Sequence, residues 1–101
     1  MDTKQPAVYI VANRKNGTLY IGVTSSLHQR IYQHKHGFFD GFTKRYGCKL
    51  LVYYKLYGTM EEAILREKYI KNCSRARKLA LIEHENIEWH DLYGRIVGDF
   101  E

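Results

Sequence analysis

The segment that most constrains the fold is a β-hairpin signature near the N-terminus. Residues 8–12 are apolar and rich in strand-forming side chains, and the same pattern resumes at residues 18–23. The five residues between them end in Asn16-Gly17, a strong signal for a tight turn. The sequence therefore predicts two antiparallel strands joined by a short loop.

Two tyrosines occupy the arms of this predicted hairpin. Tyr9 and Tyr20 share one face of the sheet if the connecting loop has an even number of residues, because side chains alternate between faces. Gly22 then lies on that face as well and leaves room for a ligand to approach. An odd loop or a β-bulge would separate the two phenols.

The rest of the chain alternates helices with one more strand. In order, we expect a helix at 27–36, a loop at 37–47, a strand at 49–57, helices at 60–72 and 75–84, and a helical turn within 86–94, where Trp89 and Leu92 pack on the body. Helix starts are indicated by Ser25/Ser26 with Gln29, by Thr59 with Glu62, and by Ser74. This order predicts a single α/β domain over residues 1–101, with a small, mainly antiparallel three-stranded sheet flanked by helices.

Charge is unevenly distributed along the chain. Residues 1–78 hold 15 Lys/Arg against 5 Asp/Glu, a balance of +10, and residues 79–101 hold 1 against 6, a balance of −5. Such a distribution is typical of a polyanion-binding face, and equally of a protein that is merely basic. No apolar run is long enough for a membrane span, the first residues do not resemble a secretory signal, and Cys48 and Cys73 read as reduced thiols, so we expect a cytoplasmic protein.

Glu67 is the most informative single residue. It falls near the centre of the apolar stripe that Met60, Ala63, Ile64 and Ile70 define on its helix. A carboxylate there needs a cation, a metal ion or water nearby, because burying it alone is costly. The alternative is a rim position with an ordinary ion pair to Lys71, four residues on.

Arg30 and His34 are also four residues apart and project from one helix face. A guanidinium beside a sheet is suited to binding a phosphate through two of its oxygens, although a solvated helix face would show the same spacing. The five histidines have no spacing typical of a zinc site.

Further cations could form a phosphate track. They are Lys68, Lys71, Arg75, Arg77 and Lys78 across the last two helices, and Lys44 and Arg45 in the aromatic-rich segment that holds Phe38, Phe39, Phe42 and Tyr46. The alternatives are a solvated face for the cations and core packing for the aromatics.

Taken together, Tyr9, the Tyr20-Ile21-Gly22 triplet, Arg30 followed by His34, and the helical Glu67 resemble the GIY-YIG nuclease domain. The resemblance spans residues 7 to about 93. Within the family, the chain resembles the small stand-alone bacterial members that consist of this domain and little else. The first triplet reads Ala7-Val8-Tyr9, with Ala and Val in place of the usual Gly and Ile, and the tyrosine is kept.

The resemblance implies divalent-metal-dependent hydrolysis of phosphodiester bonds. It implies that Glu67 holds one Mg²⁺ or Mn²⁺, that Tyr9 is the general base or orients water with His34 accepting its proton, and that Tyr20 positions the nucleophile or phosphate. Arg30 would stabilise transition-state charge. Asn86 matches an asparagine that contacts the site in the family, although Ile87 follows it where proline is usual.

Together with the resemblance, these observations predict an endonuclease; they favour DNA over RNA as its substrate but leave both open. We expect it to be directed by DNA structure or damage, as in repair, because 101 residues leave no obvious room for a separate sequence-reading domain. Sequence-specific cutting would need a protein partner that supplies the specificity. The alternatives are a nucleic-acid-binding module that does not cleave, and a protein-interaction domain that uses its acidic tail at 83–101.

Overall fold

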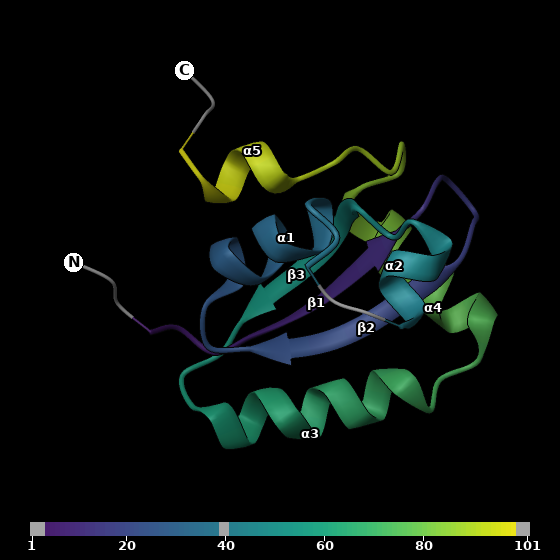
Figure 1. The fold of residues 1–101 in the computed structure, drawn as a ribbon. Helices are drawn as coiled ribbons and strands as arrows, with labels where there is room; N and C mark the ends of the chain where they lie inside the picture. Colours follow the sequence, from purple (N-terminus) through teal and green to yellow (C-terminus); the bar gives the residue numbers. More distant parts are fainter. Residues whose placement is uncertain (1–3, 39–40, 99–101) are drawn as a thin grey trace.

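The computed structural model describes residues 4–38 and 41–98, and its centre is a three-stranded antiparallel sheet (Figure 1). The strands are β1 (Ala7–Ala12), β2 (Leu19–Thr24) and β3 (Leu50–Leu56), in the spatial order β2-β1-β3. The helices are α1 (Leu27–Lys35), α2 (Phe42–Tyr46), α3 (Met60–Lys71), α4 (Arg75–Glu85) and α5 (Tyr93–Ile96). The predicted fold class is confirmed.

The hairpin register follows the even-loop prediction. Ala12 pairs with Leu19, and the Asn13 amide donates to the Thr18 carbonyl, so four residues close the turn. Tyr9 is then opposite Gly22, and Tyr20 is two residues away on the same face. A bulge does occur, but it interrupts the pairing of β1 with β3 and leaves the hairpin intact.

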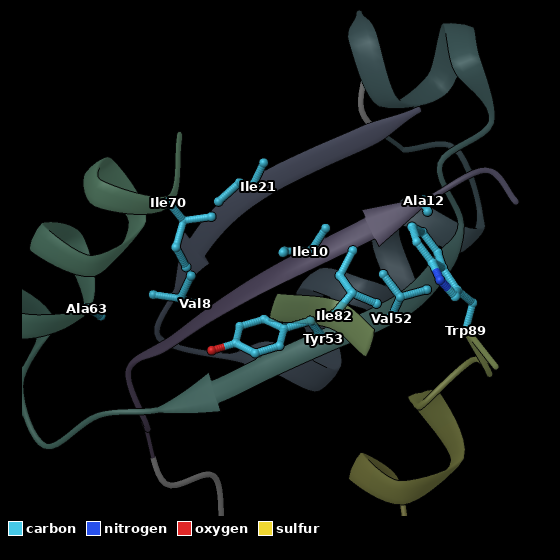
Figure 2. Close-up of a cluster of buried hydrophobic side chains, with 10 residues drawn as sticks. All are labelled: Val8, Ile10, Ala12, Ile21, Val52, Tyr53, Ala63, Ile70, Ile82 and Trp89. Atoms are coloured by element: carbon cyan, nitrogen blue, oxygen red, sulfur yellow. The ribbon is translucent and has the colours of Figure 1, made fainter. Parts of the chain in front are cut away.

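Helices cover both faces of the sheet. On one face, Val8, Ile10 and Ile21 pack against Ala63 and Ile70 of α3 and against Ile82 of α4, together with Trp89 (Figure 2). On the other face, Tyr9 and Val11 pack with Leu27 and Ile31 of α1, and Leu92 completes this second cluster. Every residue of β1 is buried, because it is the central strand between the two layers.

Two of the predicted caps are confirmed. The Thr59 hydroxyl accepts a hydrogen bond from the Glu62 amide, and the Ser74 hydroxyl accepts one from the Arg77 amide. The capping box predicted at Ser26 is wrong: this hydroxyl donates to the Gln29 side chain and caps no amide of α1, while the Ser26 amide is satisfied by the Thr24 hydroxyl.

Two segments differ from the prediction. The segment 37–47, predicted as a loop, contains the one-turn helix α2, which begins after Gly41 and ends at Gly47 in the left-handed conformation. Phe39 lies outside the described residues. The last helical turn forms at Tyr93–Ile96 rather than before Gly94, although Trp89 and Leu92 are buried as predicted.

Both cysteines are free thiols, Cys48 buried and Cys73 partly exposed. Among the described residues, no helix combines the length and the apolar character that crossing a membrane requires.

Candidate active site

The hairpin brings Tyr9 against Gly22 so closely that no larger residue fits. A Cβ atom built on Gly22 would lie 2.8 Å from Cε2 of Tyr9 and closer still to Cζ and the hydroxyl oxygen. Ordinary contact begins at about 3.4 Å. The expectation that Gly22 leaves room for a ligand is therefore wrong, because the Tyr9 ring fills this space and Gly22 is itself buried.

Helix α1 places His34 on this buried phenol. The Tyr9 hydroxyl oxygen and Nε2 of His34 are 2.9 Å apart, and both side chains are buried. Burial, helped by the positive charge of Arg30, lowers the pKa of His34 to about 4, so its imidazole is neutral at pH 7. Arg30 also donates a hydrogen bond to the phenol, so we assign Tyr9 as donor and His34 as acceptor.

The pKa of Tyr9 is raised to about 12. Burial is the largest cause, followed by the negative charge that Tyr20 would carry, and Glu67 acts in the same direction. Arg30 opposes them through its charge and its hydrogen bond. In the free protein at neutral pH, Tyr9 therefore keeps its proton and holds it toward His34.

Tyr20 extends this group toward the surface. Its ring centroid is 6.4 Å from that of Tyr9 and 5.7 Å from that of His34. On its far side, the ring of Phe42 in α2 lies 6.2 Å away. Four of the predicted site residues, Tyr9, Tyr20, Arg30 and His34, are therefore brought together from two strands and one helix.

Glu67 approaches from α3, the helix that runs along the β2 edge of the sheet (Figure 1). Its side chain is only 12% exposed and forms an ion pair of 2.7 Å with Lys71. Its charge also acts on Tyr9. The structure thus shows the alternative expected for this residue, an ion pair to Lys71, on a carboxylate that is mostly buried.

The donor groups suit a magnesium ion that shares its ligands with a substrate. No group of three His, Cys, Asp or Glu side chains that could hold a metal occurs within residues 4–38 and 41–98. Mg²⁺ commonly binds proteins through one or two carboxylates and completes its shell with water and substrate phosphate. The Glu67 carboxylate fits that requirement, provided that Lys71 yields to the ion.

Several predicted nucleic-acid contacts are engaged within the protein. Arg75 donates to the carbonyls of Asn16 and Gly17 and so ties α4 to the hairpin turn, where Arg14 and Lys78 help to line a hollow of about 450 Å³. Arg77 donates to the Tyr69 hydroxyl. Lys68 and Lys44 are exposed on α3 and α2.

Asn86 is not a site contact in this structure. Its amide nitrogen donates to the carbonyls of Val52 and His90, and its oxygen accepts from the His90 amide. Asn86 ends α4 and fixes the following turn against β3. Both its side-chain nitrogen and its side-chain oxygen are engaged by backbone groups of Val52 and His90.

Sequence reasoning missed how α2 takes part. Phe42 reaches the ring of Tyr20, and Tyr46 packs against Phe42 one helical turn later, with ring centroids 4.8 Å apart and ring planes tilted by 45°. Phe42 and Tyr46 are four residues apart and lie between Gly41 and Gly47, which was a weak signal for a short helix that presents both rings on one side.

Comparison with known proteins identifies the family. Residues 5–80 match the model of the GIY-YIG catalytic domain. A UPF0213 protein of Clostridium perfringens (strain 13 / Type A) is 38% identical over 81 residues, which cover 80% of this chain and 86% of that protein. A UPF0213 protein of Staphylococcus saprophyticus is 40% identical over 75 residues, covering 74% and 90%.

A solved structure is also similar. The solution NMR structure of a UPF0213 protein from Bacillus halodurans matches with a TM-score of 0.55 and 28% sequence identity, over 89% of this chain and 95% of that one. The family model covers well over half of the chain, and the bacterial relatives match along most of their length. The chain therefore belongs to the GIY-YIG family.

Proposed function

We propose that this protein is a divalent-metal-dependent endonuclease that hydrolyses phosphodiester bonds of DNA. The observation that carries the proposal is the buried hydrogen bond between Tyr9 and His34, with Arg30 bonded to the same phenol. A purely structural tyrosine does not need a neutral histidine and a guanidinium, whereas phosphoryl transfer uses a proton acceptor and a cation at one point.

Arg30 binds the scissile phosphate in this mechanism, because its planar fork matches two phosphate oxygens. Its charge then stabilises the negative charge that grows on those oxygens in the transition state. Tyr20, beside Tyr9 and open to the surface, positions the phosphate or the attacking water.

Tyr9 orients the attacking water, takes the proton that this water loses as its oxygen bonds to phosphorus, and passes its own proton to Nε2 of His34. The bond between phosphorus and the leaving oxygen breaks, and that oxygen takes up a proton from solvent. The raised pKa of Tyr9 favours this role over that of a free phenolate base, because the phenol does not ionise alone at neutral pH. The neutral imidazole of His34 is ready to accept the proton. Glu67 would hold one Mg²⁺ or Mn²⁺, which supplies Lewis-acid polarisation of the phosphate.

One observation favours a second candidate, a nucleic-acid-binding module that does not cleave. Lys71 occupies the Glu67 carboxylate in an ion pair of 2.7 Å, and a chain that never bound metal would keep this pair. Such a module would bind through the same basic surface with affinity that falls steeply as salt rises.

The proposed substrate is DNA with an altered structure or damage, and the proposed location is the cytoplasm. The elements of the described chain build the sheet and its two layers, and none forms a separate sequence-reading unit. We propose that recognition of a particular sequence, where it occurs, comes from a protein partner.

The test is cleavage by the purified protein of plasmid, flap and single-stranded DNA with Mg²⁺, Mn²⁺ or a chelator. We expect Glu67→Gln to lose at least 100-fold in rate, whereas Glu61→Gln, an exposed carboxylate on the first turn of the same helix, should cut normally. Cleavage that survives Glu67→Gln or a chelator would exclude the mechanism. Binding in chelator with no cleavage of any substrate would favour the non-cleaving module.

A further inference from the structure

Helix α2 presents two aromatic rings to solvent on one side. Phe42 and Tyr46 are one helical turn apart, their ring centroids are 4.8 Å apart, and the residues are 46% and 43% exposed. Leaving two large rings half exposed forgoes the stabilisation that burial would give, and adjacent exposed apolar groups commonly mark binding sites. We call these two rings the α2 platform.

The platform is held on an anchored piece of backbone. Thr43, between the two rings in sequence, is buried, and its carbonyl accepts a hydrogen bond of 2.9 Å from the amide of buried Cys48. The Arg45 amide bonds to the Gly41 carbonyl at 2.9 Å and closes the turn. The rings are thus displayed by an ordered helical turn whose other side belongs to the protein interior.

The platform is continuous with the candidate active site. Phe42 lies 6.2 Å from Tyr20, and Tyr20 lies 5.7 Å from His34, so a row of rings leads from the buried pair to the surface. The guanidinium of Arg45 lies over the Tyr46 ring at 5.6 Å, which adds a positive charge at the outer end. Aromatic faces edged by a cation suit a ligand that carries both flat rings and negative charge.

We propose that the α2 platform stacks unpaired nucleobases of the substrate strand next to the scissile phosphate, so that the preferred substrate is single-stranded at the cut. This inference rests on the proposed function and specifies its substrate. Bases inside a duplex have both faces covered by their neighbours, and only an unpaired base can lie on a protein ring. The net charge of +5 disfavours a second copy of this chain as the occupant and favours a polyanion.

The experiment measures binding in chelator, so that no cleavage intervenes. A fluorescent 12-nucleotide DNA strand and the duplex of the same sequence are titrated with wild type, Phe42→Leu and Tyr46→Leu at one fixed salt concentration. Leucine keeps apolar area but removes the flat ring face. We expect each variant to bind the single strand at least about fivefold more weakly, the lower end of what one aromatic–base stack contributes, and to bind the duplex within twofold of wild type.

Tyr32→Leu is the matched control. Tyr32 is 45% exposed, but its ring contacts are with His36 and Phe38 on the other side of α1. It should bind both DNAs as wild type does. In addition, 2-aminopurine in the single strand should be quenched on binding to wild type and less so on binding to Phe42→Leu, while Phe42→Trp, which keeps a ring, should restore single-strand affinity.

Equal losses on single strand and duplex, or no loss on either, would overturn the platform while leaving the cleavage test untouched. A selective loss on the single strand together with no cleavage of any DNA would support the platform and reject the nuclease. Recovery of affinity by Phe42→Trp guards against misfolding, since that variant replaces the same residue.

Discussion

Gly22→Ala should damage the site without removing any polar group. The added Cβ would lie 2.8 Å from Cε2 of Tyr9, so the ring must retreat by at least 0.6 Å to reach the 3.4 Å of ordinary contact, and by more at its tip. The ring has little freedom to do so, because Tyr9 is buried in the cluster with α1 and bonded to His34 at 2.9 Å.

The cost follows from three contributions. Overpacking a well-packed core costs about 1–3 kcal/mol, and weakening a buried hydrogen bond adds about 1–3 kcal/mol. Replacing a strand glycine by alanine returns about 0.5–1 kcal/mol. The free energy of unfolding should fall by about 1–5 kcal/mol, which for ~100 residues lowers Tm by roughly 5–25 °C. The cleavage rate should fall about 100-fold, because the phenol is displaced by roughly 1 Å.

Urea unfolding followed by circular dichroism measures the free energy of unfolding, and single-turnover cleavage measures the rate of the chemical step. Gly58→Ala is the control, since its Cβ would meet only Glu62 Oε1 at 3.7 Å; it should change stability by less than about 1 kcal/mol. In a Tyr9→Leu background, which removes the ring tip, Gly22→Ala should cost less than about 0.5 kcal/mol. An equal cost in both backgrounds, or a stable and active Gly22→Ala, would refute the close-packing argument.

Three further predictions concern other parts of the site and its support. Because His34 has a pKa of about 4 folded and 6.5 unfolded, the unfolded chain binds more protons between these values; stability should fall by up to about 3 kcal/mol as pH drops from 6.5 to 4, and His34→Gln should flatten the slope of urea-derived stability against pH. Arg30→Lys keeps the charge but loses the planar fork, so single-turnover cleavage should slow at least about tenfold with Tm little changed. Asn86→Ala leaves the Val52 carbonyl and the His90 backbone without their partner, so urea unfolding should show a loss of about 2–4 kcal/mol with unchanged cleavage per folded molecule; a slower rate per folded molecule would return Asn86 to the site.

The hairpin and the helix starts could be predicted because their causes are local. An Asn-Gly turn with an even loop fixes which side chains share a face, and Thr59 and Ser74 cap helices by bonding amides three residues on. Ser26 has the same local sequence signal, but its amide, which the Gln29 side chain would accept from in a capping box, donates to the Thr24 hydroxyl instead.

The features that could not be predicted from the sequence depend on packing between elements that are distant along the chain. The lowered pKa of His34 comes from the way α1 covers β1, and no spacing within the helix reveals that depth. Helix α2 is a single turn, too short for periodicity to identify, and it is fixed by Thr43 and Cys48 in the interior. The role of Asn86 depends on β3, 34 residues earlier in the chain.

Strand β1 has a further consequence for how this protein responds to fluctuations. It pairs with a neighbour along both edges and is buried from end to end, so its amides should exchange with solvent only when the whole molecule opens. Tyr9 is thereby fixed to the most protected part of the chain. We expect the one-turn helix α2, which carries the platform, to open at a lower free energy than β1, because a single turn has few backbone hydrogen bonds. Mild denaturant should then release the platform first and leave the phenol in place, so that single-strand binding returns without refolding of the core.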